Sequence, residues 1–273
     1  MRSVFEFADP KQQRIYEKLN EFIGPGAAVF FRDACWIMAN PVELKTAAHL
    51  VAHCLREVEE LFRMILIGQK FRKISMNEQI EKILSLLALP ANESKIIKNL
   101  WLGFYGLLSK FAHKRGVHTI WRLEEIYEQW DRALALFESL LKVIHLRLPE
   151  WKHEVDDLLT KSALNPPSED DITKLTHYIP VKLHNDFFER LENPEWVEPL
   201  WEKGFFREPP QLIYEPWPEA KYLARMAKHK PELVARIILE MEDTENVAVL
   251  EDLVDAALAM PPDISARLVE KAK

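Results

Sequence analysis

An eight-residue phrase occurs three times in the C-terminal part of this chain of 273 residues. PELVARII at 231–238 has a close copy, PDISARLV, at 262–269 and a looser copy, PEWVEPLW, at 194–201. The copies begin 37 and 31 residues apart, a spacing typical of repeats built from two helices. Each copy starts with proline and an acidic residue, as the first turn of a helix often does. Such helix pairs cannot bury their apolar faces alone, so we expect them to stack.

The rest of the sequence also favours helices. Glycine is scarce, with 7 residues, and no segment alternates apolar and polar residues as a strand would. In several N-terminal segments apolar residues recur three and four positions apart, which is the rhythm of a helix with one buried face. These segments are 10–22, 27–39, 42–67, 76–88, 94–113 and 122–146. We therefore predict an all-α chain in which an N-terminal helical bundle is followed by a short α-solenoid of helix pairs.

The two parts are predicted to meet at 162–168, where the sequence reads SALNPPS. A proline pair stops a helix, and Ser168 followed by three acidic residues is a strong helix start. We place a bundle domain at 1–161 and a repeat domain at 168–273. Helices of the second domain are expected at 172–178, 182–191, 195–203, 219–228, 232–240, 247–259 and 263–271. The last repeat lacks a polar capping helix, so either its final helix is the cap or, as we favour, the chain is part of a longer polypeptide.

Charge is unevenly divided between the two parts. Residues 1–165 carry 23 Lys and Arg against 21 Asp and Glu, a net charge of +2. Residues 166–273 carry 13 Lys and Arg against 22 Asp and Glu, a net charge of −9. Phosphate contacts need clustered cations, so the acidic C-terminal part is expected to be a poor general binder of nucleic acid.

Cysteine usage and hydropathy indicate the compartment. The two cysteines, Cys35 and Cys54, are too few for a disulfide framework, which favours a reducing cytoplasm. The first residues lack the charged start and apolar stretch of a signal peptide, and no run of 18 uncharged apolar residues is present. We therefore predict cytoplasmic localisation and no membrane partner.

His49 and His53 stand four residues apart on an expected helix, so their side chains share a face that could hold a metal ion. Two ligands do not complete a site, and position 50 is leucine where an HExxH motif has its general-base glutamate. The chain also lacks P-loop, GxGxxG, GxSxG and paired CxxC motifs. We predict no metal and no cofactor, and we interpret the histidine pair as a polar flank of the bundle.

A cluster of basic residues ends the helix expected at 94–113. It comprises Lys110, His113, Lys114, Arg115 and His118. Cations at a helix C-terminus complement the helix dipole, which gives the cluster a structural explanation. The functional alternative is a site facing RNA, in which histidine acts as acid or base and arginine holds phosphate.

A helix containing LREVEELF at 55–62, a helix ending in LSKFAH at 108–113 and a long closing helix follow one another in the bundle. This order, over about 42–146, resembles the HEPN superfamily of bacterial helical domains. Active members are metal-independent ribonucleases with an arginine, then four to six intervening residues, then a histidine. Here no arginine lies four to seven positions before His113, and only two residues separate Arg115 from His118. The resemblance therefore implies the inactive kind, which serves interaction, sensing or dimerisation in bacterial defence and stress proteins.

Residues 170–273, with their three repeat copies, resemble HEAT-like or armadillo-like α-solenoids, and such repeats imply a surface that binds another protein. The proline-rich loop at 207–218 is expected to run extended over the repeats, held by Tyr214 and Trp217. Trp196 and Trp201 are expected nearby. These four aromatic residues either pack the first repeat or form an exposed patch that binds a protein partner.

Two functions of different classes follow. We favour a non-enzymatic protein–protein interaction or sensor module, as the N-terminal part of a larger bacterial defence or stress protein. Its partner would be another protein, further domains of the same polypeptide, or a second copy in a homodimer. The alternative is a metal-independent HEPN-type ribonuclease that acts through His113, Arg115 and His118. RNA is a partner only under this alternative, where Lys110 and Lys114 would help Arg115 to hold it.

Overall fold

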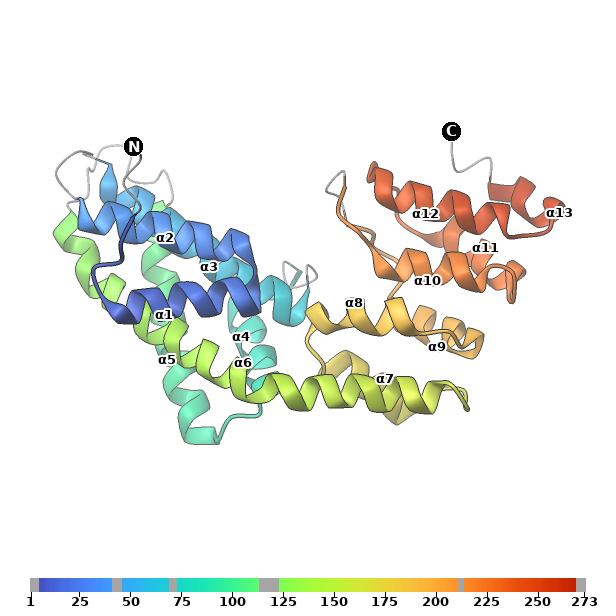
Figure 1. The fold of residues 1–273 in the computed structure, drawn as a ribbon, viewed down its shortest axis with the longest axis horizontal. Helices are drawn as coiled ribbons and strands as arrows, with labels where there is room; N and C mark the ends of the chain where they lie inside the picture. Colours follow the sequence, from blue (N-terminus) through green and yellow to red (C-terminus); the bar gives the residue numbers. More distant parts are fainter. Residues whose placement is uncertain (1–4, 41–45, 69–72, 113–122, 211–213, 269–273) are drawn as a thin grey trace. The chain divides into compact units, whose positions relative to one another are not determined.

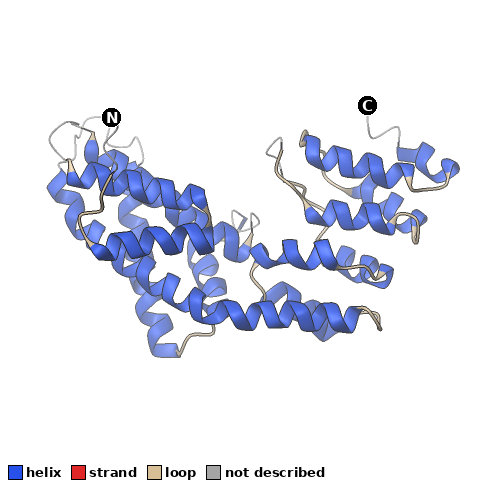
Figure 2. Ribbon diagram, viewed as in Figure 1, coloured by secondary structure: helices blue, strands red, loops and turns tan. Residues whose placement is uncertain are grey.

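The structure is a computed structural model that describes residues 5–40, 46–68, 73–112, 123–210 and 214–268. Within these ranges every regular element is a helix and no strand is present, which confirms the predicted all-α class (Figure 1; Figure 2). The chain forms two compact units, Met1–Pro149 and Glu150–Lys273.

The described part of the first unit is built from helices. They are α1 (Pro10–Lys18), the π-helical η1 (Leu19–Ile23), α2 (Pro25–Ala39), α3 (Ala47–Ile67), α4 (Met76–Leu87), α5 (Ala91–Ala112), the 3₁₀ turn η4 (Leu123–Ile126) and the first part of α6 (Tyr127–Ser162). The second unit contains the end of α6 and a series of shorter helices. These are α7 (Glu169–His177), α8 (Val181–Arg190), η5 (Pro194–Trp196), α9 (Val197–Glu202), α10 (Pro218–Met226), α11 (Pro231–Glu240), α12 (Val247–Leu258), α13 (Pro262–Ser265) and η6 (Ala266–Leu268).

Phe137 of α6 lies at the centre of the first unit's core. Its ring centroid is 5.6 Å from that of Phe62 on α3, 5.9 Å from Phe104 on α5 and 6.3 Å from Phe31 on α2. All four side chains are fully buried, so one aromatic cluster joins four helices. The buried positions of α3, α5 and α6 follow the three-and-four spacing that the sequence predicts.

α6 is longer than its sequence pattern predicts. The periodicity predicts a helix ending near residue 146, but α6 continues through Pro149 to Ser162. Proline inside a helix removes a backbone hydrogen bond and costs about 3 kcal/mol. Burial of Trp151, Val155 and Leu158 contributes roughly 2 kcal/mol per side chain and outweighs that cost. Val155 and Leu158 belong to the core of the second unit, and the boundary between the units lies at Pro149, which differs from the predicted 162–168.

The helices of the second unit lie in two rows. α8, α10 and α12 contact one another in that order, and so do α9, α11 and α13 (Figure 1). The copies of the repeated phrase at Pro231 and Pro262 begin α11 and α13, and the copy at Pro194 begins η5, which leads directly into α9. The three copies therefore occupy corresponding places along this row. The assignment to a solenoid family stays a prediction.

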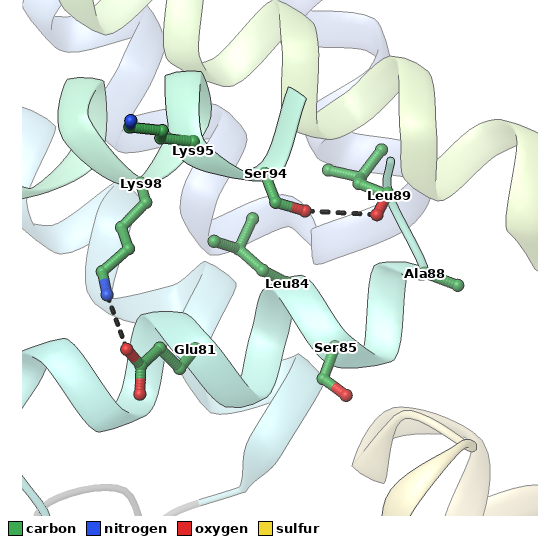
Figure 3. A pocket seen from close by; sticks show the side chains of 8 residues that line it. All are labelled: Glu81, Leu84, Ser85, Ala88, Leu89, Ser94, Lys95 and Lys98. Atoms are coloured by element: carbon green, nitrogen blue, oxygen red, sulfur yellow. Dashed lines mark hydrogen bonds and ion pairs between the residues drawn. The ribbon is translucent and has the colours of Figure 1, made fainter. Parts of the chain in front are cut away.

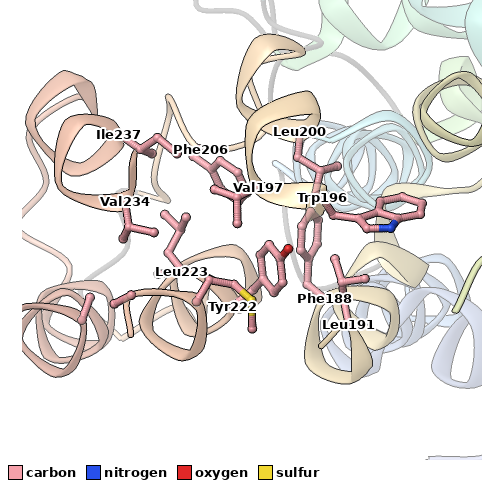
Figure 4. Packing of buried hydrophobic residues seen from close by; sticks show 14 of the residues in the cluster. Phe188, Leu191, Trp196, Val197, Leu200, Phe206, Tyr222, Leu223, Val234 and Ile237 are labelled. Carbon is pink, nitrogen blue, oxygen red and sulfur yellow. The ribbon is translucent and has the colours of Figure 1, made fainter. Parts of the chain in front are cut away.

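The repeated phrase also accounts for the core between the rows. Its seventh position is occupied by Leu200, Ile237 and Leu268, and all three are buried. Phe188 of α8 and Tyr222 of α10 belong to the same buried cluster, and Figure 4 shows them together with Leu200 and Ile237 of the first two repeats. The seventh residue of each copy is therefore a core residue, as expected when equivalent positions of successive repeats pack in the same way.

The loop before α10 is bound by a side chain from the start of α12. Asn246, the N-cap of α12, is fully buried and donates from Nδ2 to the carbonyl oxygens of Pro210 (3.2 Å) and Glu215 (2.8 Å). Trp217 is buried at the end of this loop, in agreement with its predicted anchoring role. Tyr214 is 77% exposed, so the expectation that it also holds the loop is wrong.

Candidate functional site

α12 is apolar on two opposite faces. Val249 and Ala256 are fully buried in the core of the second unit. On the outer face the exposed side chains are Val247 (36%), Leu250 (43%), Val254 (58%) and Leu258 (78%). Their spacing of three, four and four positions places them in one line along the helix. We call these four residues the α12 stripe.

The α12 stripe resembles a helix face that is normally covered by another helix. A helix that is apolar all round is normally covered on more than one side. α10 covers the inner side of α12, and in Figure 1 α12 is the last described helix of its row. Apolar residues scattered singly on a surface are ordinary, but four aliphatic side chains in one line are not. The stripe is therefore the described surface best suited to receive another helix.

The surface around the α12 stripe is acidic. Residues 237–266 include eight Asp and Glu and no Lys or Arg. Glu251 and Asp255 lie on α12 beside the stripe, and both are exposed. The third acid of α12, Asp252, is partly buried; burial raises its pKa, and Lys221 of α10 opposes that shift.

A hollow of about 460 Å³ lies between α4 and α5 (Figure 3). Lys98 points across it and donates to Glu81 at 2.5 Å, and the hydroxyl of Ser94 donates to the carbonyl oxygen of Leu89 at 3.3 Å. The hollow is a surface groove between two helices. Lys98 with Glu81, and Ser94 with Leu89, already bind one another there. We assign the hollow no chemistry.

A second hollow lies between α9 and α11, two neighbouring helices of one row. Lys230 at its edge pairs with Glu195 at 2.9 Å. The guanidinium of Arg236 lies over the ring of Trp201, with its central carbon 4.9 Å from the ring centroid. These cations join successive repeats, so a structural role explains them.

The most buried charges of the first unit form a network. Glu59 and Arg63 lie one turn apart on α3 and share two hydrogen bonds of 2.8 Å. Glu59 also accepts a bond of 2.6 Å from Nε1 of Trp101, and Arg63 donates one of 2.6 Å to Gln79. Burial raises the pKa of Glu59, while Arg63 and Trp101 act in the opposite direction. The network joins α3, α4 and α5, and its named partners are protein groups, so we assign it a structural role.

His184 of α8 is the most buried histidine of the second unit. Its Nε2 donates to the carbonyl oxygen of Leu175 at 2.9 Å and lies 3.2 Å from that of Ile179. Burial lowers the pKa of His184 to about 4, so the ring is neutral at pH 7. The side chain joins α8 to the end of α7 and is not placed for acid–base chemistry.

The residues of the ribonuclease hypothesis are mostly beyond the described part of the chain. Lys110 belongs to α5. His113, Lys114, Arg115 and His118 lie outside the described residues. The ribonuclease and the RNA contacts that it requires therefore stay predictions of the sequence.

His49 and His53 lie on α3, four residues apart, as the helix prediction requires. Nδ1 of His53 is 3.6 Å from Oε1 of Glu57, and its ring centroid is 6.4 Å from that of Phe30. Among the residues that the structure describes, no three His, Cys, Asp or Glu side chains gather closely enough to hold a metal ion. The contacts of His53 are those of a surface residue on a helix.

The four aromatic residues are expected either to pack the first repeat or to form an exposed patch that binds a protein. Trp196 is fully buried and Trp217 is 7% exposed, because both pack into the core of the second unit. Trp201 is partly buried against the same core, and Tyr214 is exposed. Trp196 and Trp217 therefore follow the packing alternative, and the alternative of an exposed patch is wrong for these two residues. Burial of a large aromatic side chain removes much apolar surface from water, and this explains why both tryptophans lie in the core.

Sequence reasoning missed the α12 stripe, although a signal for it exists. In VAVLEDLVDAAL the apolar residues point in every direction around a helix, and only three residues are charged. A helix with a single buried face has a polar opposite face. The missing polar face therefore predicts a second neighbour and could have located the surface.

Comparison of the chain with protein-family models, with characterised proteins and with solved structures gives no significant match. The HEPN-like and HEAT-like resemblances therefore stay predictions. None of the described helices combines the length and the apolar character needed to cross a bilayer.

Proposed function

We propose that this protein is a non-enzymatic protein-binding module and that a partner docks on the α12 stripe. One observation carries the proposal: four exposed aliphatic side chains form a line on a helix whose opposite face is already buried. Amphipathic helices pack against apolar lines of this kind. The expected partner is another protein or a further domain of the same polypeptide.

We further propose that the second unit is a short α-solenoid of the HEAT-like kind. The two rows of helices and the position of the repeat copies support this proposal. In such arrays each repeat contacts its neighbours, and a terminal repeat normally presents a polar outer face. α12 belongs to the last described repeat, and its outer face is apolar, so it is suited to bind a further element.

The α12 stripe supplies a modest part of the binding free energy. Full burial of a valine or leucine side chain contributes about 1.5–3 kcal/mol. The four side chains are on average about half exposed, so covering them contributes roughly 4 kcal/mol in all. Loss of translational and rotational freedom on association costs at least about 4 kcal/mol. We therefore expect the partner to make further contacts, and the acidic residues around the stripe are the nearest groups that can provide them.

We also propose that the protein works in the reducing cytoplasm. Cys35 and Cys54 are free and buried. Burial raises the pKa of Cys35 to about 12 and is the main cause that raises that of Cys54 to about 11. Thiols of this kind behave as apolar core groups rather than as nucleophiles.

The proposal is tested by comparing the proteins that the full chain and two matched variants retain from a native lysate. Val254→Asp together with Leu258→Asp places charge on the α12 stripe. Leu164→Asp places charge at another exposed leucine of the same unit. We expect one protein to be retained by the wild type and by the Leu164 variant and to be lost from the double variant. Equal retention by all three chains would contradict the proposal.

A further inference from the structure

We propose that the segment docking on the α12 stripe is a cationic amphipathic helix, with aliphatic residues on one face and lysine or arginine along its flanks. This inference rests on the proposed function and adds the chemistry of the partner. It is carried by the position of an exposed apolar line within an acidic surface.

Acidic residues lie at both ends of the α12 stripe and along one side. The exposed acids of this region are Glu240, Glu242, Asp243, Glu245, Glu251, Asp255 and Asp263. Four of them precede α12, two lie on it and one follows it. The two arginines that bracket this stretch are already engaged, because Arg236 lies over Trp201 and Arg267 pairs with Glu232. Arg207 is also exposed and lies beside Glu242 before α12, where the backbone N–H of Glu242 donates to its carbonyl oxygen. On α12 itself the exposed charges beside the stripe are those of Glu251 and Asp255, and a cationic flank complements them.

The remaining acid of this region acts on the inner side of α12. Asp252 is partly buried, and Lys221 and Arg225 of α10 are close enough to affect its ionisation. Their positive charge therefore offsets Asp252 on the side of α12 that faces α10. Glu251 and Asp255 stay available on the outer side.

The geometry of the α12 stripe selects a helix as its occupant. From Val247 to Leu258 the line runs for about 16 Å, or three turns of helix. A second helix presents side chains at the same three-and-four spacing, so its ridges can enter the grooves along this line. An extended strand would leave its backbone N–H and C=O groups without partners against an aliphatic surface. α10 already packs on the inner side of α12, and the partner helix would occupy the equivalent place outside.

The same acidic residues disfavour other occupants. A second copy of this chain would bring an identical acidic surface against the first, and like charges facing one another reduce affinity. Nucleic acid and anionic lipid surfaces are repelled for the same reason. A cationic helix is the occupant that satisfies both the apolar line and the charges beside it.

The test uses a synthetic peptide of about 20 residues as the probe, with leucine on one helical face and lysine on the flanks. A second peptide carries glutamate in place of each lysine, and a third has the lysine peptide's composition in scrambled order. Binding of each fluorescently labelled peptide to the full chain is measured by anisotropy. We expect the lysine peptide to bind at least about tenfold more tightly than the other two. Its affinity should also fall when the salt concentration is raised from about 0.05 M to about 0.5 M, because salt screens exposed charges.

Two protein variants locate the binding and test the role of charge. Val254→Asp with Leu258→Asp should abolish binding of the lysine peptide. Glu251→Lys with Asp255→Lys should weaken the lysine peptide about tenfold and strengthen the glutamate peptide. Glu189→Lys with Glu192→Lys makes the same change of charge at exposed positions elsewhere in the unit and should leave the preference unchanged.

The outcomes separate this inference from the proposed function. If both charged peptides bind equally and both lose affinity when the α12 stripe is substituted, the stripe binds helices but the inference about charge is wrong. If the lysine peptide does not bind, or binds the stripe variant equally well, the inference is also overturned. Concentration-dependent dimerisation of the wild type that the stripe variant abolishes would replace the cationic partner with a second copy of this chain. The lysate comparison with the Leu164 control tests the proposed function independently of any peptide.

Discussion

Glu59 and Arg63 are buried together, and each depends on the other. The guanidinium holds both oxygens of the carboxylate, while Trp101 and Gln79 complete the hydrogen bonds from α5 and α4. A buried ion pair adds little stability by itself, because desolvation opposes the attraction. Removal of one partner is different, since it leaves a buried charge without compensation.

Glu59→Gln preserves the shape of the side chain and removes its charge. We expect it to lower the free energy of unfolding by about 3–5 kcal/mol, because Arg63 is left uncompensated. Joint substitution of Glu59 and Arg63 by methionine should cost less than Glu59→Gln alone. Urea unfolding followed by circular dichroism measures the stability of both variants. The control is Glu93→Gln at an exposed position, whose free energy of unfolding should lie within about 0.5 kcal/mol of the wild-type value. A Glu59→Gln chain as stable as this control would show that the network is not structural.

His184 makes stability depend on pH. Its pKa in the folded protein, about 4, is below its ordinary value of 6.5, so the unfolded chain binds the proton more readily. The contribution of neutral His184 to the free energy of unfolding is complete above about pH 6.5 and is lost as the pH falls toward 4. At pH 5 the loss amounts to about 2 kcal/mol. Between pH 7 and pH 5 the wild type should lose about this much more stability than His184→Gln. The exposed His153→Gln serves as the control, and an equal pH dependence of the wild type and His184→Gln would refute the assignment.

Most helices could be predicted because the residues that start a helix and the spacing of its apolar residues indicate the same bounds as its packing. Ser168 forms the capping box with Asp171 that starts α7, and the prolines of the repeated phrase begin η5, α11 and α13. The end of α6 could not be predicted, because burial of Trp151 outweighs the local effect of Pro149. The α12 stripe was missed because periodicity was sought for one buried face, whereas α12 is apolar on two.

The two faces of α12 should respond differently to charge. Val254→Asp with Leu258→Asp lies on the exposed face and should change the free energy of unfolding by less than about 1 kcal/mol. Val249→Asp lies on the buried face and should cost at least about 3 kcal/mol or prevent folding, because an unpaired carboxylate enters the core. Thermal unfolding compares the two. A large loss of stability from the exposed-face variant would mean that these side chains are covered within the protein itself.

At the scale of the whole molecule, the chain consists of two units with separate cores. The first is centred on Phe137, and the second is a continuous cluster from Val155 to Leu268. Length and composition could not place the division between them. The division lies at Pro149 because α6 continues past the expected helix end near residue 146 and contributes Val155 and Leu158 to the second core.

A chain of residues 150–273 should therefore fold without the rest of the protein. The buried cluster of the second unit draws all its members from this range, and a domain of this size can support its own core. We expect a helical circular dichroism spectrum and a single cooperative thermal transition. A non-cooperative melt, with helicity restored only when residues 1–149 are added, would show that the second core is incomplete.

The most direct test of the account is site-specific photo-crosslinking in the cells that make the protein. A photoreactive amino acid is placed at position 258 on the α12 stripe or at position 164, which is equally exposed in the same unit. If the stripe is a docking surface, position 258 should give one dominant protein adduct, which excess lysine peptide should suppress, and position 164 should give none. Equal yields at the two positions, or no adduct at 258 under conditions where the reagent is active, would contradict the central claim.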